Sequence, residues 1–263
     1  MGKVVVVTSG KGGVGKTTVT ANIGTALAIM GKKVVLVDTD IGLRNLDVVL
    51  GLENRIVYDI IDVVGGHCRQ DQALIKDKRN KNLALLPAAQ TRDKTAIDRE
   101  QMIKLIADLK KDHDYVLIDS PAGIEFGFQN AIVGADEAVV VTTPEVSAIR
   151  DADRVIGILE SQGLKEPKVI INRIRAGMVK RGDMMSIDDM IEILAVKLLG
   201  IIPEDEEIIV STNRGEPIAF QKRSQTAEAF SNLARRLEGE ELPILALNKI
   251  NLVDRLKRMI KIS

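Results

Sequence analysis

The feature that most restricts the fold of this chain is a series of short aliphatic runs, separated by stretches with helical spacing. The runs that we interpret as strands are Val4–Val7, Val34–Val37, Leu83–Leu86, Tyr115–Ile118, Ala138–Val141, Lys168–Asn172 and Leu199–Ile202. Strands that are apolar at nearly every position are typical of parallel sheets, whose two faces are both covered by helices. Alternation of strands and helices favours right-handed crossovers. We therefore predict an α/β fold with a mostly parallel, twisted sheet and helices on both faces.

Four segments between these runs have the periodicity of amphipathic helices. They are Thr17–Met30, Asp98–Lys111, Ser147–Gln162 and Thr226–Leu237. Gly31 and Gly163 directly follow two of them, where a glycine commonly ends a helix. Ser147 is of a residue type that caps helix N-termini, so we expect it to cap the third helix.

Composition narrows the class of protein. Apolar residues make up 45% of the 263 residues and aromatic residues only 2%, so the core must be aliphatic. The 37 basic and 37 acidic residues balance. A protein that coats nucleic acid needs a basic face, so we expect no specific nucleic acid partner. The lone Cys68 excludes an internal disulfide and a cysteine-rich metal cluster. The sequence shows no signal peptide and no membrane span, and we expect a cytoplasmic protein.

A phosphate-binding pattern lies between the first strand and the first helix. Residues 10–17 match G-x-x-x-x-G-K-[ST] in full. Glycines let the backbone turn its N–H groups toward an anion, and the following helix adds its positive N-terminal dipole. Lys16 is expected on the β and γ phosphates of ATP, and the Thr17 hydroxyl on Mg²⁺. The pattern predicts a three-layer P-loop NTPase fold that binds ATP or ADP with Mg²⁺. The nucleotide-binding residues that we predict in the loop are Gly10, Lys11, Gly12, Gly13, Val14, Gly15, Lys16, Thr17 and Thr18.

Carboxylates follow two of the predicted strands. Asp38 and Asp40 come after the second strand, and Asp119 comes after Tyr115–Ile118. Ligands of an open α/β sheet bind at the carboxyl ends of its strands, so we expect all three carboxylates at one edge. An aspartate in the position of Asp119 usually holds Mg²⁺ in phosphate-loop proteins. Spacing alone leaves open that Asp40 only caps a turn.

Two polar segments follow later strands, where we expect adenine recognition. They are Asn172–Arg173 and Pro203–Glu204–Asp205. Ordinary turn chemistry explains the same residues, above all Glu204 and Asp205, so both interpretations stay open.

The last twelve residues have the pattern of a basic amphipathic helix. Its apolar positions are Leu252, Val253, Leu256, Met259 and Ile260, and its basic positions are Arg255, Lys257, Arg258 and Lys261. This pattern is typical of helices that bind an anionic membrane surface, with an ordinary docked helix as the alternative. Basic residues contribute about 1 kcal/mol each near anionic lipid, whereas ordering the helix costs about 1–2 kcal/mol per residue. One tail is therefore a marginal anchor, and two linked tails bind far better.

Lys11, five residues before Lys16, goes beyond the general phosphate-loop pattern. With this lysine in Ser9–Thr18, and with the segments 38–47, 118–123 and 144–154, the chain resembles the deviant-Walker-A ATPases. That family includes septum-site-determining, chromosome-partition and nitrogenase iron proteins. The resemblance covers essentially the whole chain, and the basic tail resembles the septum-site branch. In the family, the lysine at this position reaches the partner's ATP across a dimer interface, as an arginine finger does in trans.

The resemblance makes the site assignments more definite. The catalytic set that it implies is Lys11, Lys16 and Asp40, with Asp40 positioning the attacking water. The metal set is Thr17, Asp38 and Asp119. The two segments after the later strands match the base-binding positions of the family.

The resemblance also implies a cellular role. It describes a slow, Mg²⁺-dependent, partner-stimulated ATPase that forms a homodimer with ATP and attaches reversibly to the inner face of the cell membrane. The dimer recruits a division inhibitor that governs septum placement, and in many bacteria an activator then releases it. The segment Glu145–Arg154 would lie near the inhibitor, with a cluster of charges at a helix start as the alternative.

We divide the chain into an ATPase domain (1–238), a linker (239–251) and a membrane-targeting helix (252–263). Related functions remain possible. A DNA-segregating ATPase would share the loop but need a basic DNA-binding surface. A membrane scaffold would bind nucleotide with negligible turnover. Flagellar-number ATPases carry a similar tail but usually have an extension before the loop, whereas the first strand here starts at Lys3.

Overall fold

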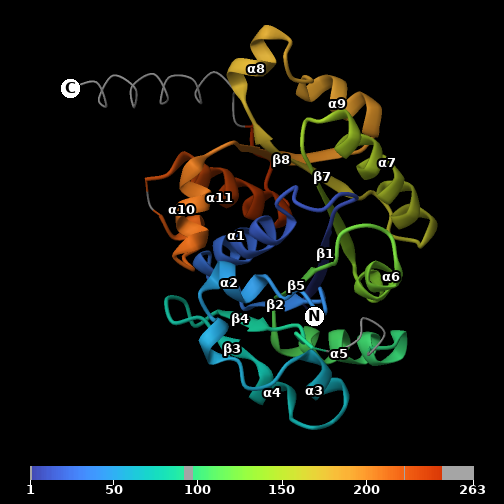
Figure 1. Cartoon of the computed structure of the whole chain (residues 1–263), viewed down its shortest axis with the longest axis vertical. Helices are drawn as coiled ribbons and strands as arrows, with labels where there is room; N and C mark the ends of the chain where they lie inside the picture. Colours follow the sequence, from blue (N-terminus) through green and yellow to red (C-terminus); the bar gives the residue numbers. More distant parts are fainter. Residues whose placement is uncertain (1, 92–96, 222, 245–263) are drawn as a thin grey trace.

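A twisted, mostly parallel sheet forms the centre of the protein (Figure 1). The computed structural model describes residues 2–91, 97–221 and 223–244. Within them the strands are β1 (Lys3–Thr8), β2 (Val34–Asp38), β3 (Ile75–Lys76), β4 (Leu83–Leu86), β5 (Tyr115–Asp119), β6 (Glu137–Thr142), β7 (Lys168–Ile174) and β8 (Lys197–Pro203). Their spatial order is β3-β4-β2-β5-β1-β6-β7-β8. Only the β3–β4 pair is antiparallel among these strands, so the predicted α/β fold is confirmed.

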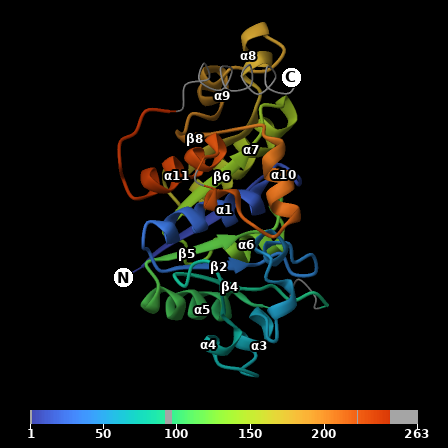
Figure 2. The ribbon, with the colours of Figure 1, turned by 90° about the vertical axis from the view of Figure 1, so that its left-hand side faces the viewer.

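Helices cover both faces of the sheet (Figure 2). The α-helices of the described residues are α1 (Lys16–Ile29), α2 (Leu46–Leu50), α3 (Ile60–Val64), α4 (Gln70–Ala73), α5 (Arg99–Asp112), α6 (Phe126–Ile132), α7 (Val146–Ser161), α8 (Ala176–Arg181), α9 (Ile187–Leu194), α10 (Glu206–Asn213) and α11 (Gln225–Leu237). Two short 3₁₀ helices are η1 (Glu53–Arg55) and η2 (Ile218–Phe220). The four predicted helices correspond to α1, α5, α7 and α11.

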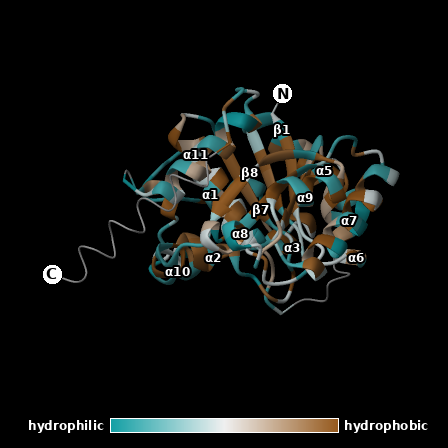
Figure 3. Ribbon diagram, turned by 90° about the horizontal axis from the view of Figure 1, so that it is seen from above, coloured by the Kyte–Doolittle hydropathy of each residue, from teal (hydrophilic) through white to brown (hydrophobic). Residues whose placement is uncertain are grey.

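Successive side chains of each central strand enter two different cores. Val4 and Val6 belong to the cluster beneath α5, α6 and α7, whereas Val5 and Val7 belong to the cluster beneath α1, α2 and α11. All four valines are 0–1% exposed. The apolar strands therefore lie between polar helix surfaces (Figure 3), which explains why the strands are apolar at every position rather than alternating.

The structure confirms the predicted helix stops and corrects the start of α7. Gly31 and Gly163 have φ values of +89° and +88°, the left-handed conformation that ends a helix. Ser147 does not cap α7, because the helix already begins at Val146 with Glu145 in the capping position. The Ser147 hydroxyl instead accepts a hydrogen bond from Lys11 Nζ, at 3.0 Å.

No helix in the described part of the chain is both long and apolar enough to cross a membrane. The predicted tail helix (252–263) and the end of the linker lie outside the described residues.

Arg79 joins three segments beside the sheet. Its guanidinium donates to the carbonyls of Leu50 (2.7 Å) and Gly215 (2.8 Å), and pairs with the buried carboxylate of Asp77 at 2.6 Å. The guanidinium also lies 4.9 Å from the centre of the Phe220 ring. Gly51 and Gly215 pack so closely that a Cβ on either would meet the other's backbone. Arg79 thereby links the end of α2 to the turn after α10.

We expect Arg79→Met to destabilise the protein by about 2–3 kcal/mol, because it leaves a buried carboxylate without its cation and two carbonyls without donors. Urea unfolding followed by circular dichroism measures the change. Arg69→Met is the matched control, because the Arg69–Asp71 pair is 72% and 70% exposed and should matter little. Equal unfolding midpoints for the two variants would show that Arg79 does not hold these segments together.

Candidate functional site

The strand register brings the predicted carboxylates to one edge of the sheet. β2 and β5 pair in parallel with Asp38 opposite Asp119, and β5 pairs with β1 so that Asp119 lies opposite Val7. The chain leaves β1 one residue later and enters the loop before α1. The ends of three neighbouring strands therefore place two carboxylates beside this loop, as the sequence predicts.

The loop from Gly10 to Gly15 has the backbone expected of a phosphate cradle. Gly13 and Gly15 have φ values of +80° and +92°, which residues other than glycine rarely adopt. Gly10 packs on α7, where an added Cβ would lie 2.3 Å from the carbonyl oxygen of Asp151. α1 begins at Lys16, directly after the loop. A helix N-terminus and a glycine-rich turn together make a suitable site for a phosphate group.

Lys16 is the buried cation of this site. Its side chain is 7% exposed, and Nζ lies 2.9 Å from Oδ1 of Asp119, which is 1% exposed. Thr20, one turn along α1, donates to the same oxygen at 3.0 Å. Thr20 was not among the predicted residues, although its spacing of four from Lys16 places it on the same helix face. In this structure the ammonium of Lys16, expected from the sequence to contact phosphate, instead pairs with the strand-end carboxylate of Asp119.

Asp38 lies in a ring of backbone donors. Its carboxylate accepts hydrogen bonds from the amides of Asp40 (3.0 Å), Asn45 (3.3 Å) and Leu46 (3.2 Å). Burial and, to a smaller extent, the nearby Asp119 carboxylate together raise the pKa of Asp38 to about 7, against the opposing effect of the Asp40 and Leu46 amides and of Lys16. Two adjacent carboxylates with one lysine leave the site short of positive charge.

These residues fit a magnesium ion. Thr17 lies half-buried at the start of α1, and Asp38 and Asp119 supply the hard oxygen ligands that Mg²⁺ prefers. The described residues contain no group of three or more histidines, cysteines or acids that would hold a metal without help. Mg²⁺ is commonly bound by one or two carboxylates together with substrate phosphates. When bound, the ion would neutralise negative charge on those phosphates.

The loops after β2 and β5 are tied to the phosphate loop. The hydroxyl of Thr39 donates to the carbonyl of Asp119 at 2.8 Å, and the amide of Gly123 donates to the carbonyl of Ser9 at 3.0 Å. Asp40 is partly buried at the rim, two residues beyond Asp38. The loop after β5 therefore contacts the phosphate loop directly, and the loop after β2 is joined to it through the end of β5.

Lys11 lies apart from Lys16 in this single chain. Its side chain is 43% exposed and contacts the start of α7, with Nζ 3.0 Å from the Ser147 hydroxyl and 3.8 Å from Glu145 Oε2. These are weak, solvent-exposed contacts that a long lysine side chain can exchange at little cost.

Asn172 braces the phosphate loop from β7. Its side-chain amide is buried and donates to the carbonyl of Val14 at 2.8 Å, while its oxygen accepts from the amide of Arg173. Gly15 leaves room for this contact, because an added Cβ would lie 2.4 Å from the Asn172 nitrogen. Arg173 has a φ value of +60°, which is uncommon for a residue with a side chain.

The second predicted base-binding segment lies next to the first. Pro203 pairs with Ile174 in the sheet, and the amide of Glu204 donates to the Ile174 carbonyl at 3.0 Å. Asp205 caps α10 by accepting from the amide of Glu207, and its other oxygen accepts from the Thr226 hydroxyl at 2.5 Å. Asp205 therefore has the structural role at a turn that the sequence analysis gave as the alternative to base binding.

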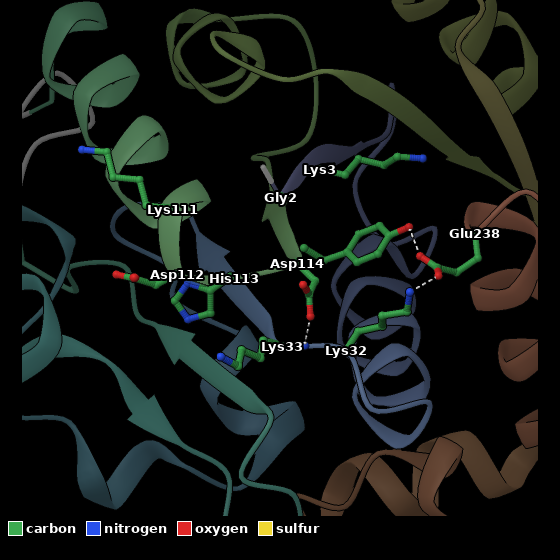
Figure 4. Close-up of a pocket in the computed structure, with 10 residues that line it drawn as sticks. Gly2, Lys3, Lys32, Lys33, Lys111, Asp112, His113, Asp114 and Glu238 are labelled. Atoms are coloured by element: carbon green, nitrogen blue, oxygen red, sulfur yellow. Dashed lines mark hydrogen bonds and ion pairs between the residues drawn. The ribbon is translucent and has the colours of Figure 1, made fainter.

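A separate hollow of about 530 Å³ lies at the opposite, amino end of the strands (Figure 4). Three of the four lysines that line it have carboxylate partners: Lys3 pairs with Glu137, Lys32 with Glu238, and Lys111 with Asp108. The Tyr115 hydroxyl donates to Glu238 at 2.5 Å. These contacts fasten the end of α11 to the sheet, so this hollow is distinct from the phosphate site.

Comparisons with known proteins agree with this geometry. Residues 5–218 match the family model described as CobQ/CobB/MinD/ParA nucleotide binding domain. The chain is 56% identical to the septum site-determining protein MinD of Bacillus subtilis over 253 residues, which is 95% of this chain and 94% of that protein.

Two solved structures are also similar. The MinC:MinD cell division protein complex of Aquifex aeolicus contains a chain with a TM-score of 0.87 and 54% identity, covering 93% of this chain and 98% of that one. MinD of Pyrococcus horikoshii in complex with Mg-ADP has a TM-score of 0.82 and 33% identity, covering 90% and 96%. The chain therefore belongs to the CobQ/CobB/MinD/ParA family of nucleotide-binding domains and, within it, to the septum site-determining ATPases of the MinD type.

Proposed function

We propose that this protein is a Mg²⁺-dependent ATPase that dimerises on binding ATP, attaches to the inner face of the cell membrane and recruits a division inhibitor. The observation that carries the proposal is the buried Lys16–Asp119 pair at the mouth of the phosphate loop, with Asp38 beside it. When a divalent cation binds Asp38 and Asp119, the Lys16 ammonium would be free to leave the carboxylate and bind a phosphate group. Membership of the septum site-determining family supports the cellular role.

The residues divide the chemistry among them. Lys16 binds the β and γ phosphates, while Thr17, Asp38 and Asp119 hold Mg²⁺ and its waters. Asp40, at the rim, orients the water that attacks the γ phosphate. The work of such a site is positioning and charge stabilisation rather than covalent catalysis. The slow turnover that we propose would rise when a partner completes the site.

The adenine side of the site is formed by two segments. They are Asn172–Arg173 and Pro203–Glu204–Asp205. The two segments adjoin at the carboxyl ends of β7 and β8, and Asn172 already contacts the phosphate loop. Asp205 caps α10, and we expect it to contribute to adenine binding by fixing the backbone conformation of this segment.

Lys11 completes the site of a second copy in the proposed dimer. We expect Lys11→Ala to bind Mg-ATP with normal affinity but to stay monomeric, because within one chain the Lys11 ammonium contacts the exposed start of α7. Light scattering in ATP and in ADP measures the mass, and a fluorescent ATP analogue measures affinity. Lys33→Ala, at the amino end of β2, is the control. An ATP-dependent dimer of the Lys11→Ala variant would exclude the cross-interface role.

The membrane and partner functions rest on two surfaces. The basic amphipathic tail (252–263) would insert its aliphatic side chains into anionic lipid. The start of α7 would bind a MinC-type inhibitor, since Val146 is 59% exposed there and is flanked by exposed charges. The similar chain of Aquifex aeolicus occurs in a complex with MinC. A MinE-type activator would stimulate hydrolysis and release the protein.

Steady-state release of phosphate from Mg-ATP, with and without anionic liposomes, tests the proposed enzyme. We expect slow hydrolysis that requires Mg²⁺. ATP binding without any turnover would favour a nucleotide-dependent scaffold, and ATP-dependent binding to DNA rather than lipid would favour a partition ATPase.

A further inference from the structure

The segment between Asp38 and α2 is held by an unusual pair of side chains, Arg44 and Asp47. Arg44 Nε lies 2.8 Å from Asp47 Oδ2, and the two side chains are 15% and 1% exposed. In the described structure neither the carboxylate oxygens of Asp47 nor Arg44 Nε has a well-aligned hydrogen-bond partner. The pair therefore joins a buried carboxylate to a partly buried guanidinium, with few well-aligned hydrogen bonds to offset the cost of desolvation.

The backbone at Arg44 carries a second cost. Arg44 has a φ value of +36°, outside the regions that residues with side chains commonly adopt. Asparagine and glycine tolerate such values better than arginine does. Backbone outliers of this kind persist only when surrounding contacts over-determine them, and they gather at functional sites.

The same segment determines the position of Asp40. The carbonyl of Asp40 accepts from the amides of Leu43 and Arg44, both at 3.1 Å. The amides of Asn45 and Leu46, directly after Arg44, donate to the Asp38 carboxylate. Arg44 thus closes a small loop whose other end is Asp40. If its side chain moved, both the Asp40 carbonyl and the Asp38 carboxylate would lose donors.

Stability alone does not explain this arrangement. Replacing a buried ion pair by apolar residues of similar volume is often neutral or stabilising, whereas removing one partner is costly. The Arg44–Asp47 pair also contributes little to hydrogen bonding. Fixing one conformation of the loop is a function that this pair can perform and that a pair of flexible apolar side chains would perform less well.

We propose that the Arg44–Asp47 ion pair is a positioning element, which holds the loop 39–46 so that Asp40 faces the phosphate site. The inference rests on the proposed ATPase function. Arg44 and Asp47 act through the backbone and touch neither the nucleotide nor the attacking water. Weakening the pair lets the loop open, which slows the chemical step but leaves the phosphate loop and its affinity for Mg-ATP intact.

The test uses the full chain with Arg44→Met, Asp47→Leu and the double variant Arg44→Met/Asp47→Leu. The double variant is decisive, because neutral residues of similar size should restore the unfolding midpoint that the single variants lose. In it we expect hydrogen exchange at the amides of Asp40, Asn45 and Leu46 to accelerate about tenfold or more. Single-turnover hydrolysis should fall about 10- to 100-fold, with the Mg-ATP dissociation constant changed less than about threefold.

Arg69→Met/Asp71→Leu is the matched control, since that arginine–aspartate pair is exposed. Arg44→Lys keeps the charge but loses the fixed guanidinium geometry, and it should slow hydrolysis in the same way if the double variant fails to fold. Wild-type amide exchange and rate in the folded double variant would overturn the proposal, as would a loss of affinity that accounts for the whole effect. Faster amide exchange together with no hydrolysis by the unaltered protein would contradict the proposed ATPase and support the loop-holding role.

Discussion

Replacing Lys16 by alanine is expected to lower the affinity for Mg-ATP by about 100-fold or more. Lys16 is the cation at the phosphate loop with 7% exposure, and its ammonium lies 2.9 Å from Asp119. Hydrogen bonds to charged groups contribute about 1.5–3 kcal/mol each, so the loss of two phosphate contacts accounts for the factor of 100. Without Lys16, the carboxylates of Asp38 and Asp119 would also repel the incoming phosphates until Mg²⁺ neutralises them.

Titration with a fluorescent ATP analogue at fixed Mg²⁺ measures this change, and a thermal melt confirms that the variant is folded. Thr20→Val is a useful companion, because it removes only the hydroxyl that supports Asp119. We expect it to weaken binding by less than about tenfold. If the folded Lys16→Ala variant bound Mg-ATP within about threefold of the unaltered protein, phosphate recognition would have to lie elsewhere.

Deleting residues 252–263 is expected to abolish binding to anionic liposomes while leaving ATP binding and dimerisation intact. The predicted helix contributes five aliphatic and four basic residues. Each basic residue contributes about 1 kcal/mol near anionic lipid, and the aliphatic residues contribute by burial. Since each tail is a marginal anchor, removing both from a dimer leaves no comparable source of membrane affinity.

A matched variant separates the two contributions of the tail. Lys257→Ala/Arg258→Ala keeps the aliphatic residues and should bind anionic liposomes more weakly, and that binding should depend less on salt because only Arg255 and Lys261 remain as basic residues of the predicted helix. Sedimentation of the truncated chain with liposomes at the level of the full chain would refute membrane attachment through this segment.

The sequence predicts the phosphate loop and its carboxylates well, because these features depend on local rules. Gly13 and Gly15 adopt the left-handed backbone that the motif requires, and Lys16 starts α1. Asp38 and Asp119 lie opposite one another because parallel strands that both end in aspartate bring their carboxyl ends to one edge. Each of these predictions needs only a motif or a strand pattern.

Other features depend on contacts between distant residues. Asn172 supports the loop by donating to Val14, 158 residues away in the chain. Ser147 is a residue type that caps helices, but its hydroxyl accepts a hydrogen bond from Lys11 instead. That contact depends on how α7 packs against the phosphate loop. Single-sequence patterns carry no information on such contacts.

Short helices were equally difficult to predict. α2 has five residues, too few to show an amphipathic period. The positive φ of Arg44 and the burial of Asp47 occur where α2 packs against α1 and α10, which are contacts between distant parts of the chain. Those two residues occur in a segment that the family resemblance included, but nothing in the residue types marks them as an ion pair.

The central claim is that ATP places this protein on the membrane by joining two weak anchors. Co-sedimentation of the full chain with anionic liposomes, in Mg-ATP and in Mg-ADP, tests it most directly. We expect strong binding in ATP, little binding in ADP, and binding by Lys11→Ala that stays at the ADP level in both nucleotides. Equal binding of the unaltered chain in ATP and ADP would contradict it.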